Sequence, residues 1–267
     1  MTKTATAPLE LLLHLADCAL VLGQRNAEWC GHGPVLEEDI ALANLSLDLI
    51  GQARLLYQHA AAQINDQPGL AAALGLPAAV SAPVTEDSLA YFRDAGAFRN
   101  YTLLELPHTG PLAPGASHAR DYAVTTVRNF LYSALMALRW EALAGDADTQ
   151  LAAIAARSLK EARYHLRHAR DWLVRLGDGT AVSHARTQAA LDHLMPYTAE
   201  FWHDPATAAL RAAWDAQVDD ALAEATLSRP DARAAATHGS RGRHSEHLDY
   251  LLAEMQVLAR QHPGATW

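Results

Sequence analysis

The sequence contains few of the residues that cross-link a chain or attract nucleic acid. Only Cys18 and Cys30 occur among its 267 residues, which excludes a disulfide framework and a site of four cysteines and predicts reduced thiols in the cytoplasm. Its 21 basic residues are outnumbered by 30 acidic ones, giving a formal net charge of -9. This balance disfavours binding to nucleic acid or to an anionic membrane surface. Lys160 is the only lysine beyond Lys3, and because we expect it on a solvated face, Schiff-base chemistry is disfavoured.

Signals for membrane insertion, export and several common catalytic classes are also missing. The most apolar stretch, residues 40–50, is far shorter than the about 20 residues of a membrane span and contains three polar side chains. Residues 1–8 lack the basic start and apolar stretch of an export signal. No nucleophile-elbow motif and no phosphate-binding glycine loop occur. We therefore expect a cytoplasmic protein without membrane contact.

Helix-forming residues dominate what is present. Alanine supplies 56 residues, and no run alternates apolar and polar residues as a strand would. Apolar residues recur at helical spacing, with Thr85 placed to cap a short helix and Ser117 and Asp148 placed to cap long ones. The helices predicted in this way cover residues 8–31, 36–66, 85–92, 117–144, 148–177, 183–203, 204–226 and 245–262.

The order of these helices predicts one all-α domain, residues 1–267, with the ferritin-like architecture. Short links make antiparallel hairpins of residues 8–66 and 117–177, and a crossover of about fifty residues lets the two pairs pack side by side. The helices within residues 183–262 are additions to this bundle. Because ferritin-like bundles often hold two irons, the architecture raises the question of a metal site.

A di-iron cage in such a bundle takes a carboxylate from each of two helices and a Glu-x-x-His pair from each of the other two. On the predicted fourth helix, Glu161 and His165 are four apart rather than three, so the motif is off by one, and His165 is better interpreted as a core histidine. The predicted second helix offers only Asn44 and Asp48 before His59. Half of the cage is therefore missing.

Asn44, Ser46 and Asp48 are better interpreted as buried polar groups that fix the register of the bundle. Their expected partners are one another or Gln24, Arg25 and Arg54.

Other carboxylate and histidine pairs are weaker candidates. Gly31 separates Glu28 from His32 and ends their helix, so we interpret Glu28 as structural. Two literal Glu-x-x-His strings are discounted, because Pro107 interrupts the first and the second lies at a helix end. These strings are residues 105–108 and 200–203.

Six segments of the sequence stand out together. They are residues 28–32 (EWCGH), 41–54 (ALANLSLDLIGQAR), 160–166 (KEARYHL), 244–248 (HSEHL), 252–256 (LAEMQ) and 263–267 (PGATW). These segments resemble the C subunit of bacterial phenylacetyl-CoA epoxidase. Their order and spacing span nearly the whole chain. What departs from the family pattern is the alanine-rich link from Gln67 to Val84.

The resemblance implies a role in adding one oxygen atom across the aromatic ring of phenylacetyl-CoA. It implies a non-catalytic subunit that holds no metal or cofactor and supports a homologous catalytic chain carrying the di-iron centre, in a complex with a reductase and accessory subunits. In this interpretation, a degenerate remnant of the metal site would consist of Glu28, Asn44, Asp48, Glu161 and His165.

Two rival interpretations remain open. One is a free-standing di-iron oxidase that uses the carboxylates and the histidine at positions 28, 48, 161 and 165. The other is a helical scaffold unrelated to oxygenation.

A last candidate is the segment from Ser228 to Arg243, which has no apolar period. Alone it is predicted to be a mobile basic loop, either simply solvated or able to contact a partner or CoA phosphates through its arginines. These are Arg229, Arg233, Arg241 and Arg243.

Overall fold

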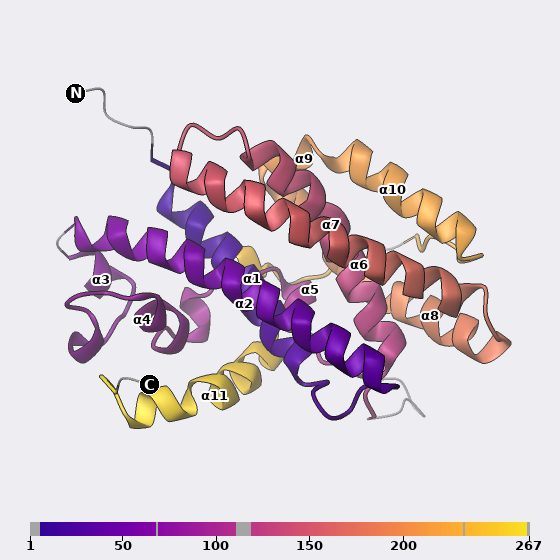
Figure 1. The fold of residues 1–267 in the computed structure, drawn as a ribbon, viewed down its shortest axis with the longest axis horizontal. Coiled ribbons are helices and arrows are strands. Elements are labelled where there is room, and N and C mark those ends of the chain that lie inside the picture. The colour runs from indigo at the N-terminus through magenta and orange to yellow at the C-terminus, as the bar shows by residue number, and fades with distance from the viewer. Residues whose placement is uncertain (1–5, 68, 111–118, 232, 266–267) are drawn as a thin grey trace. The chain divides into compact units, whose positions relative to one another are not determined.

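The computed structural model describes residues 6–67, 69–110, 119–231 and 233–265, and within these ranges it contains helices and no strand. Figure 1 shows the elements in chain order. None of the described helices is long and apolar enough to cross a membrane. The α-helices are α1 (Leu9–Ala27), α2 (Leu36–Asn65), α3 (Leu70–Ala73), α4 (Glu86–Tyr91), α5 (Thr102–Glu105), α6 (Tyr122–Leu143), α7 (Thr149–Gly177), α8 (Ala181–Leu194), α9 (Pro205–Ala208), α10 (Arg211–Glu224) and α11 (Glu246–Gln261). The 3-10 helices are η1 (Ala78–Val80), η2 (Ala95–Ala97), η3 (Met195–His203) and η4 (Gly239–Arg241).

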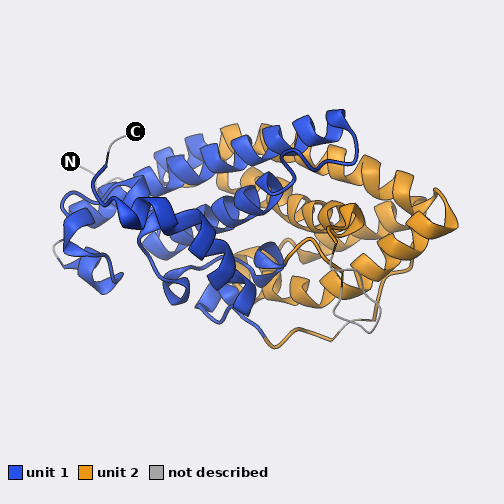
Figure 2. Cartoon of the chain, turned by 90° about the horizontal axis from the view of Figure 1, so that it is seen from below, with its two compact units in different colours: residues 1–106, 147–154, 237–267 blue, residues 107–146, 155–236 orange. Residues whose placement is uncertain are grey.

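The chain divides into two compact units (Figure 2). Unit 1 contains residues 1–106, 147–154 and 237–267, and unit 2 contains residues 107–146 and 155–236. The first residues of α7 therefore belong to unit 1 and the remainder to unit 2. The expectation of one domain with two hairpins packed side by side stays a prediction.

In unit 1, α1 packs along α2, and α4, α5 and α11 complete the core. The side chains of Leu12, Leu56, Phe98 and Leu248 are fully buried. These residues come from segments far apart in the sequence, so the C-terminal helix α11 is part of the core rather than an appendage.

In unit 2, α6 and the rest of α7 run antiparallel. Tyr122 at the start of α6 meets Trp172 near the end of α7 edge-to-face, with ring centroids 5.5 Å apart. Toward the other end of the pair, Arg163 donates to Glu141 over 2.9 Å. Helices α8 and α10 pack against α6, where the buried indole of Trp214 donates to the carbonyl of Leu131 over 3.0 Å.

Two of the predicted helix caps are confirmed. Thr85 forms a reciprocal capping box with Ser88 at the start of α4. Asp148 Oδ1 accepts from the N–H groups of Gln150 and Leu151 over 2.9 and 3.0 Å. Both side chains satisfy backbone donors that the first helical turn leaves without a partner.

The starts of two other predicted helices need correction, and the helix predicted over residues 204–226 is divided into α9 and α10. Ser117 lies outside the described residues, and α6 begins only after Asp121, which accepts from Ala123. The cap of α8 is Thr180, and Ser183 is instead the third residue of that helix and closes its capping box.

Two further segments also differ from their predicted structure. The α-helix predicted over residues 183–203 changes to a 3-10 helix at Met195, because Pro196 lacks the N–H group that an α-helix would need. Residues 67–84, for which the sequence predicts no helix, contain α3 and η1.

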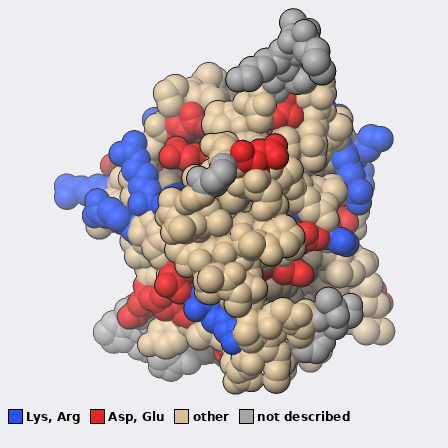
Figure 3. Space-filling model, turned by 90° about the vertical axis from the view of Figure 1, so that its left-hand side faces the viewer, with Lys and Arg blue, Asp and Glu red and all other residues tan. Residues whose placement is uncertain are grey.

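Charged side chains on the face shown in Figure 3 lie in small separate groups of either sign, with uncharged surface between them. This arrangement puts no broad positive field over that face, and a positive field is what attracts polyanions.

Candidate functional site

The unit 1 members of the predicted metal-site remnant do not form a buried set. Asn44 is exposed on α2, and Asp48 is half-buried one turn further along. Ser46 donates to the carbonyl of Leu42 in its own helix over 2.8 Å. The prediction that Asn44 is a buried polar group is therefore wrong, because the face of α2 that carries it points outward.

The expected partners of this polar set have other contacts. Arg25 forms an ion pair with the half-buried Glu28, which directly follows α1, and also donates to the carbonyl of Glu105. Arg54 pairs with Glu86 over 3.2 Å. These contacts therefore do not support the prediction that Arg25 and Arg54 are the partners of Asn44 and Asp48.

The unit 2 members lie on α7. Glu161 is half-buried and forms an ion pair with Arg157 over 3.4 Å, one turn earlier. His165 is buried, and its ring lies 6.3 Å from that of Tyr164. Lys160 is exposed, as expected. His165 is the only histidine of the predicted remnant, and it is buried.

The donor set does not fit a di-iron cage. Such a cage needs four carboxylates and two histidines. The remnant supplies Glu28, Asp48 and Glu161 as carboxylates and His165 as its only histidine, while the amide of Asn44 carries no charge. Two of these carboxylates are already paired with arginine. Among the residues that the structure describes, no group of three or more His, Cys, Asp or Glu side chains could hold a metal ion.

The first Glu-x-x-His string belongs to a different kind of site. The carboxylate of Glu105 is fully buried and accepts from Asn100 over 2.9 Å and from the Ser245 N–H over 2.6 Å. His244 Nδ1 lies 2.7 Å from the same carboxylate, and its Nε2 donates to the carbonyl of Phe98 over 3.0 Å. Glu105 therefore fastens the start of α11 to the segment before α5, which is a structural role.

The remaining members of the two strings have separate surroundings. His108 lies in unit 2 and contacts the hydroxyl of Thr125 over 2.6 Å. In the second string, Glu200 is buried and His203 is exposed. The discounting of both strings as metal sites stays a prediction.

The arginine-rich segment is not one loop. Arg229 pairs with Asp215 and Asp219 of α10. Arg233 is exposed in unit 2, whereas Arg241 and Arg243 are exposed in unit 1. The prediction of a single mobile basic loop is wrong for its two ends, because one end is held by ion pairs and the other by a close turn.

That close turn depends on two glycines. A Cβ on Gly239 would lie 2.4 Å from the carbonyl oxygen of Asn100, and Gly242 has a φ of +75°. His238 and Arg243 pair through their backbones across the turn. The turn therefore presents Arg241 from an ordered backbone.

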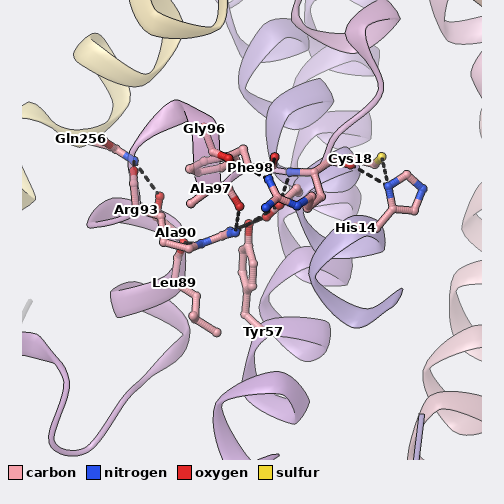
Figure 4. A network of polar contacts seen from close by, with 12 residues as sticks. His14, Cys18, Tyr57, Leu89, Ala90, Arg93, Gly96, Ala97, Phe98 and Gln256 are labelled. Atoms are coloured by element: carbon pink, nitrogen blue, oxygen red, sulfur yellow. Dashed lines mark hydrogen bonds and ion pairs between the residues drawn. The ribbon is translucent and has the colours of Figure 1, made fainter. Parts of the chain in front are cut away.

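A buried polar network that sequence reasoning missed lies in unit 1 (Figure 4). Arg93 and Asp17 form an ion pair with neither side chain exposed, and Tyr57 donates to the same carboxylate. Burial, and then the charge of Asp17, raise the pKa of Tyr57 well above its ordinary value. The N–H of Arg99 donates to Asp17 over 2.7 Å, so the network ties the segment after α4 to α1 and α2. Positions 17, 57 and 93 form no local motif that would reveal it.

These observations define an all-α protein whose described residues bring together no group of metal donors. The family model described as "Phenylacetic acid catabolic protein" matches residues 1–267, and the chain belongs to this family, whose fold is ferritin-like and helical.

A curated relative extends this finding. The chain is 42% identical over 270 residues to a protein of Escherichia coli (strain K12) that is named as the C subunit of 1,2-phenylacetyl-CoA epoxidase. The match covers 96% of this chain and 97% of the relative.

Proposed function

We propose that this chain is a non-catalytic structural subunit of a multicomponent phenylacetyl-CoA ring 1,2-epoxidase. The observation that carries the proposal is the 42% identity, over nearly the full length of both chains, to a protein named as the C subunit of such an enzyme. The depleted donor set supports the non-catalytic part of the proposal. The chain would hold no cofactor of its own, and the di-iron centre would lie in a homologous catalytic chain.

The partners in this proposal are that homologous chain, a reductase and accessory subunits. The subunit would act through its surface, by binding and supporting the iron-bearing chain. A cytoplasmic location, inferred from two cysteines that form no disulfide, belongs to the same proposal.

The free-standing di-iron oxidase is the main rival. It would have to use Glu28, Asp48, Glu161 and His165, and metal binding would break the ion pairs of two of these carboxylates with arginine. The pair with the exposed Arg157 is weak, so the loss of the Arg25–Glu28 pair is the main cost that iron binding would have to offset. An unrelated helical scaffold is disfavoured by family membership.

Co-expression with the homologous chain of the same family from the same organism tests the proposal. We expect the two chains to purify together, and phenylacetyl-CoA-dependent oxygen consumption, with the reductase present, to need both. Oxygen consumption that is unchanged when this chain is left out would contradict a supporting role.

A further inference from the structure

The outer face of α2 carries a row of large apolar side chains that the described residues leave wholly or partly exposed. Leu36 is 72% exposed, Ile40 54%, Leu47 65% and Ile50 39%. We call these four residues the outer α2 face. Single exposed leucines are ordinary on proteins, but a contiguous apolar row marks a place where something binds.

The spacing shows that these residues share one side of the helix. Steps of four, seven and three residues are those of a single helical face. The opposite side is formed by Leu42, Leu45 and Leu49, which are buried against the core of unit 1. This half of α2 is therefore apolar on two sides, and a helix of that kind is normally covered on both.

Ile40 and Leu47 recur at helical spacing in the sequence, and the structure places both on the exposed side of α2. The core needs only one of the two apolar sides, so the other must owe its composition to something outside unit 1. At 1.5 Å per residue the row is about 21 Å long, enough for another helix to lie along it.

The charges beside the row indicate what kind of partner it fits. No lysine or arginine occurs between Arg25 and Arg54. Glu37 is exposed, and Asp39 and Asp48 are half-buried, on the same half of α2. The complementary surface is thus an apolar helix face bordered by basic residues.

The same charges argue against a second copy of this chain as the occupant. A two-fold interface brings the same patch of both subunits together, so Glu37 and Asp39 of each copy would face acidic residues of the other. Like charges at an interface disfavour that partner.

We infer that the outer α2 face is the docking site for a different helical chain, whose apolar face is bordered by arginine or lysine. This inference rests on the proposed function, in which that chain is the homologous iron-bearing subunit. To that function the inference adds the surface of this chain, and the charge pattern beside it, that the homologous subunit would recognise.

The test measures the dissociation constant between this chain and the homologous chain by calorimetry. Leu47→Arg places a positive charge in the row, and we expect it to weaken binding about 30-fold or more. The matched control is Val182→Arg on α8, at a side chain that is 67% exposed, where we expect unchanged binding. Leu47→Ser, which adds no charge, is expected to weaken binding too and keeps the test decisive if the arginine variant fails to fold.

A second pair of variants tests the charge pattern. Glu37→Lys is expected to weaken binding several-fold and to reduce its salt dependence, since it repels a basic border. Glu254→Lys, an equal charge change at an exposed position of α11, is the control and is expected to have no effect.

The outcomes separate the two proposals. Binding by the wild type that Leu47→Arg and Leu47→Ser leave unchanged overturns the docking site but not the proposed function. A wild-type chain that does not bind the homologous chain overturns both. Self-association of the wild type that Leu47→Arg abolishes, measured by light scattering, overturns the choice of partner in favour of a second copy.

Discussion

Removal of the Asp17 carboxylate is predicted to be the most destabilising single change in the buried network of unit 1. In Asp17→Ala, Arg93 would stay buried with no exposed surface and lose its counter-charge, keeping only neutral acceptors: the carbonyls of Leu89 and Ala97 and the hydroxyl of Tyr57. Tyr57 and the N–H of Arg99 would lose their acceptor as well.

The magnitude follows from this burial. Breaking a buried pair by removing one partner costs about 3–5 kcal/mol, because the other charge is left uncompensated. At roughly 2–4 °C per kcal/mol for a chain of this size class, the melting temperature should fall by about 6–20 °C. Urea unfolding followed by far-ultraviolet circular dichroism measures the free energy of unfolding directly.

Two controls separate this explanation from general damage. Glu86→Gln weakens the ion pair of Glu86 with the exposed Arg54 and should cost less than about 1 kcal/mol. The double variant Asp17→Leu with Arg93→Met removes both charges and should recover most of the lost stability. A loss below about 1 kcal/mol in Asp17→Ala, or no recovery in the double variant, would refute the reasoning.

Three further predictions concern other parts of the chain. Burial raises the pKa of the Asp148 carboxyl, but the hydrogen bonds that it accepts outweigh burial and lower this pKa to about 2. The donors are the N–H groups of Ala7 and Leu151 and the side chain of His59. The contribution of Asp148 to the free energy of unfolding is therefore complete above its ordinary pKa of 3.8 and is lost as the pH falls toward 2. It amounts to about 2 kcal/mol, and acid titration of unfolding should show a shallower loss in Asp148→Ala. Gly239→Ala should destabilise the turn through its clash with the Asn100 carbonyl, whereas Gly51→Ala, with open space around the new Cβ, should be neutral or stabilising in thermal melts. Arg241→Ala combined with Arg243→Ala should leave the melting temperature unchanged and weaken complex formation or raise the KM for the CoA ester. If neither complex formation nor the KM changes, these two arginines are solvated side chains with no binding role.

Local signals explain why the long helices were predictable. The caps at Thr85 and Asp148 and the apolar spacing of α1, α2 and α7 all act within one or two turns, which a sequence window captures. Ser183 was misassigned because serine and threonine are both favoured helix caps, and tertiary packing decides between neighbouring candidates.

Contacts between distant residues explain what could not be predicted. Asp17 and Arg93 are 76 positions apart, and Glu105 and His244 are 139 apart, so neither pair leaves a periodic signal. Periodicity also shows that α2 has apolar sides without showing which one faces the core, and the misplaced Asn44 follows from that ambiguity.

The absence of a working metal site is the central claim, and the iron content of the isolated chain tests it most directly. After anaerobic loading with Fe(II) and removal of unbound metal, elemental analysis should find no stoichiometric iron in this chain. Two irons per chain, lost in Glu161→Ala or His165→Ala, would contradict the account and favour the free-standing oxidase.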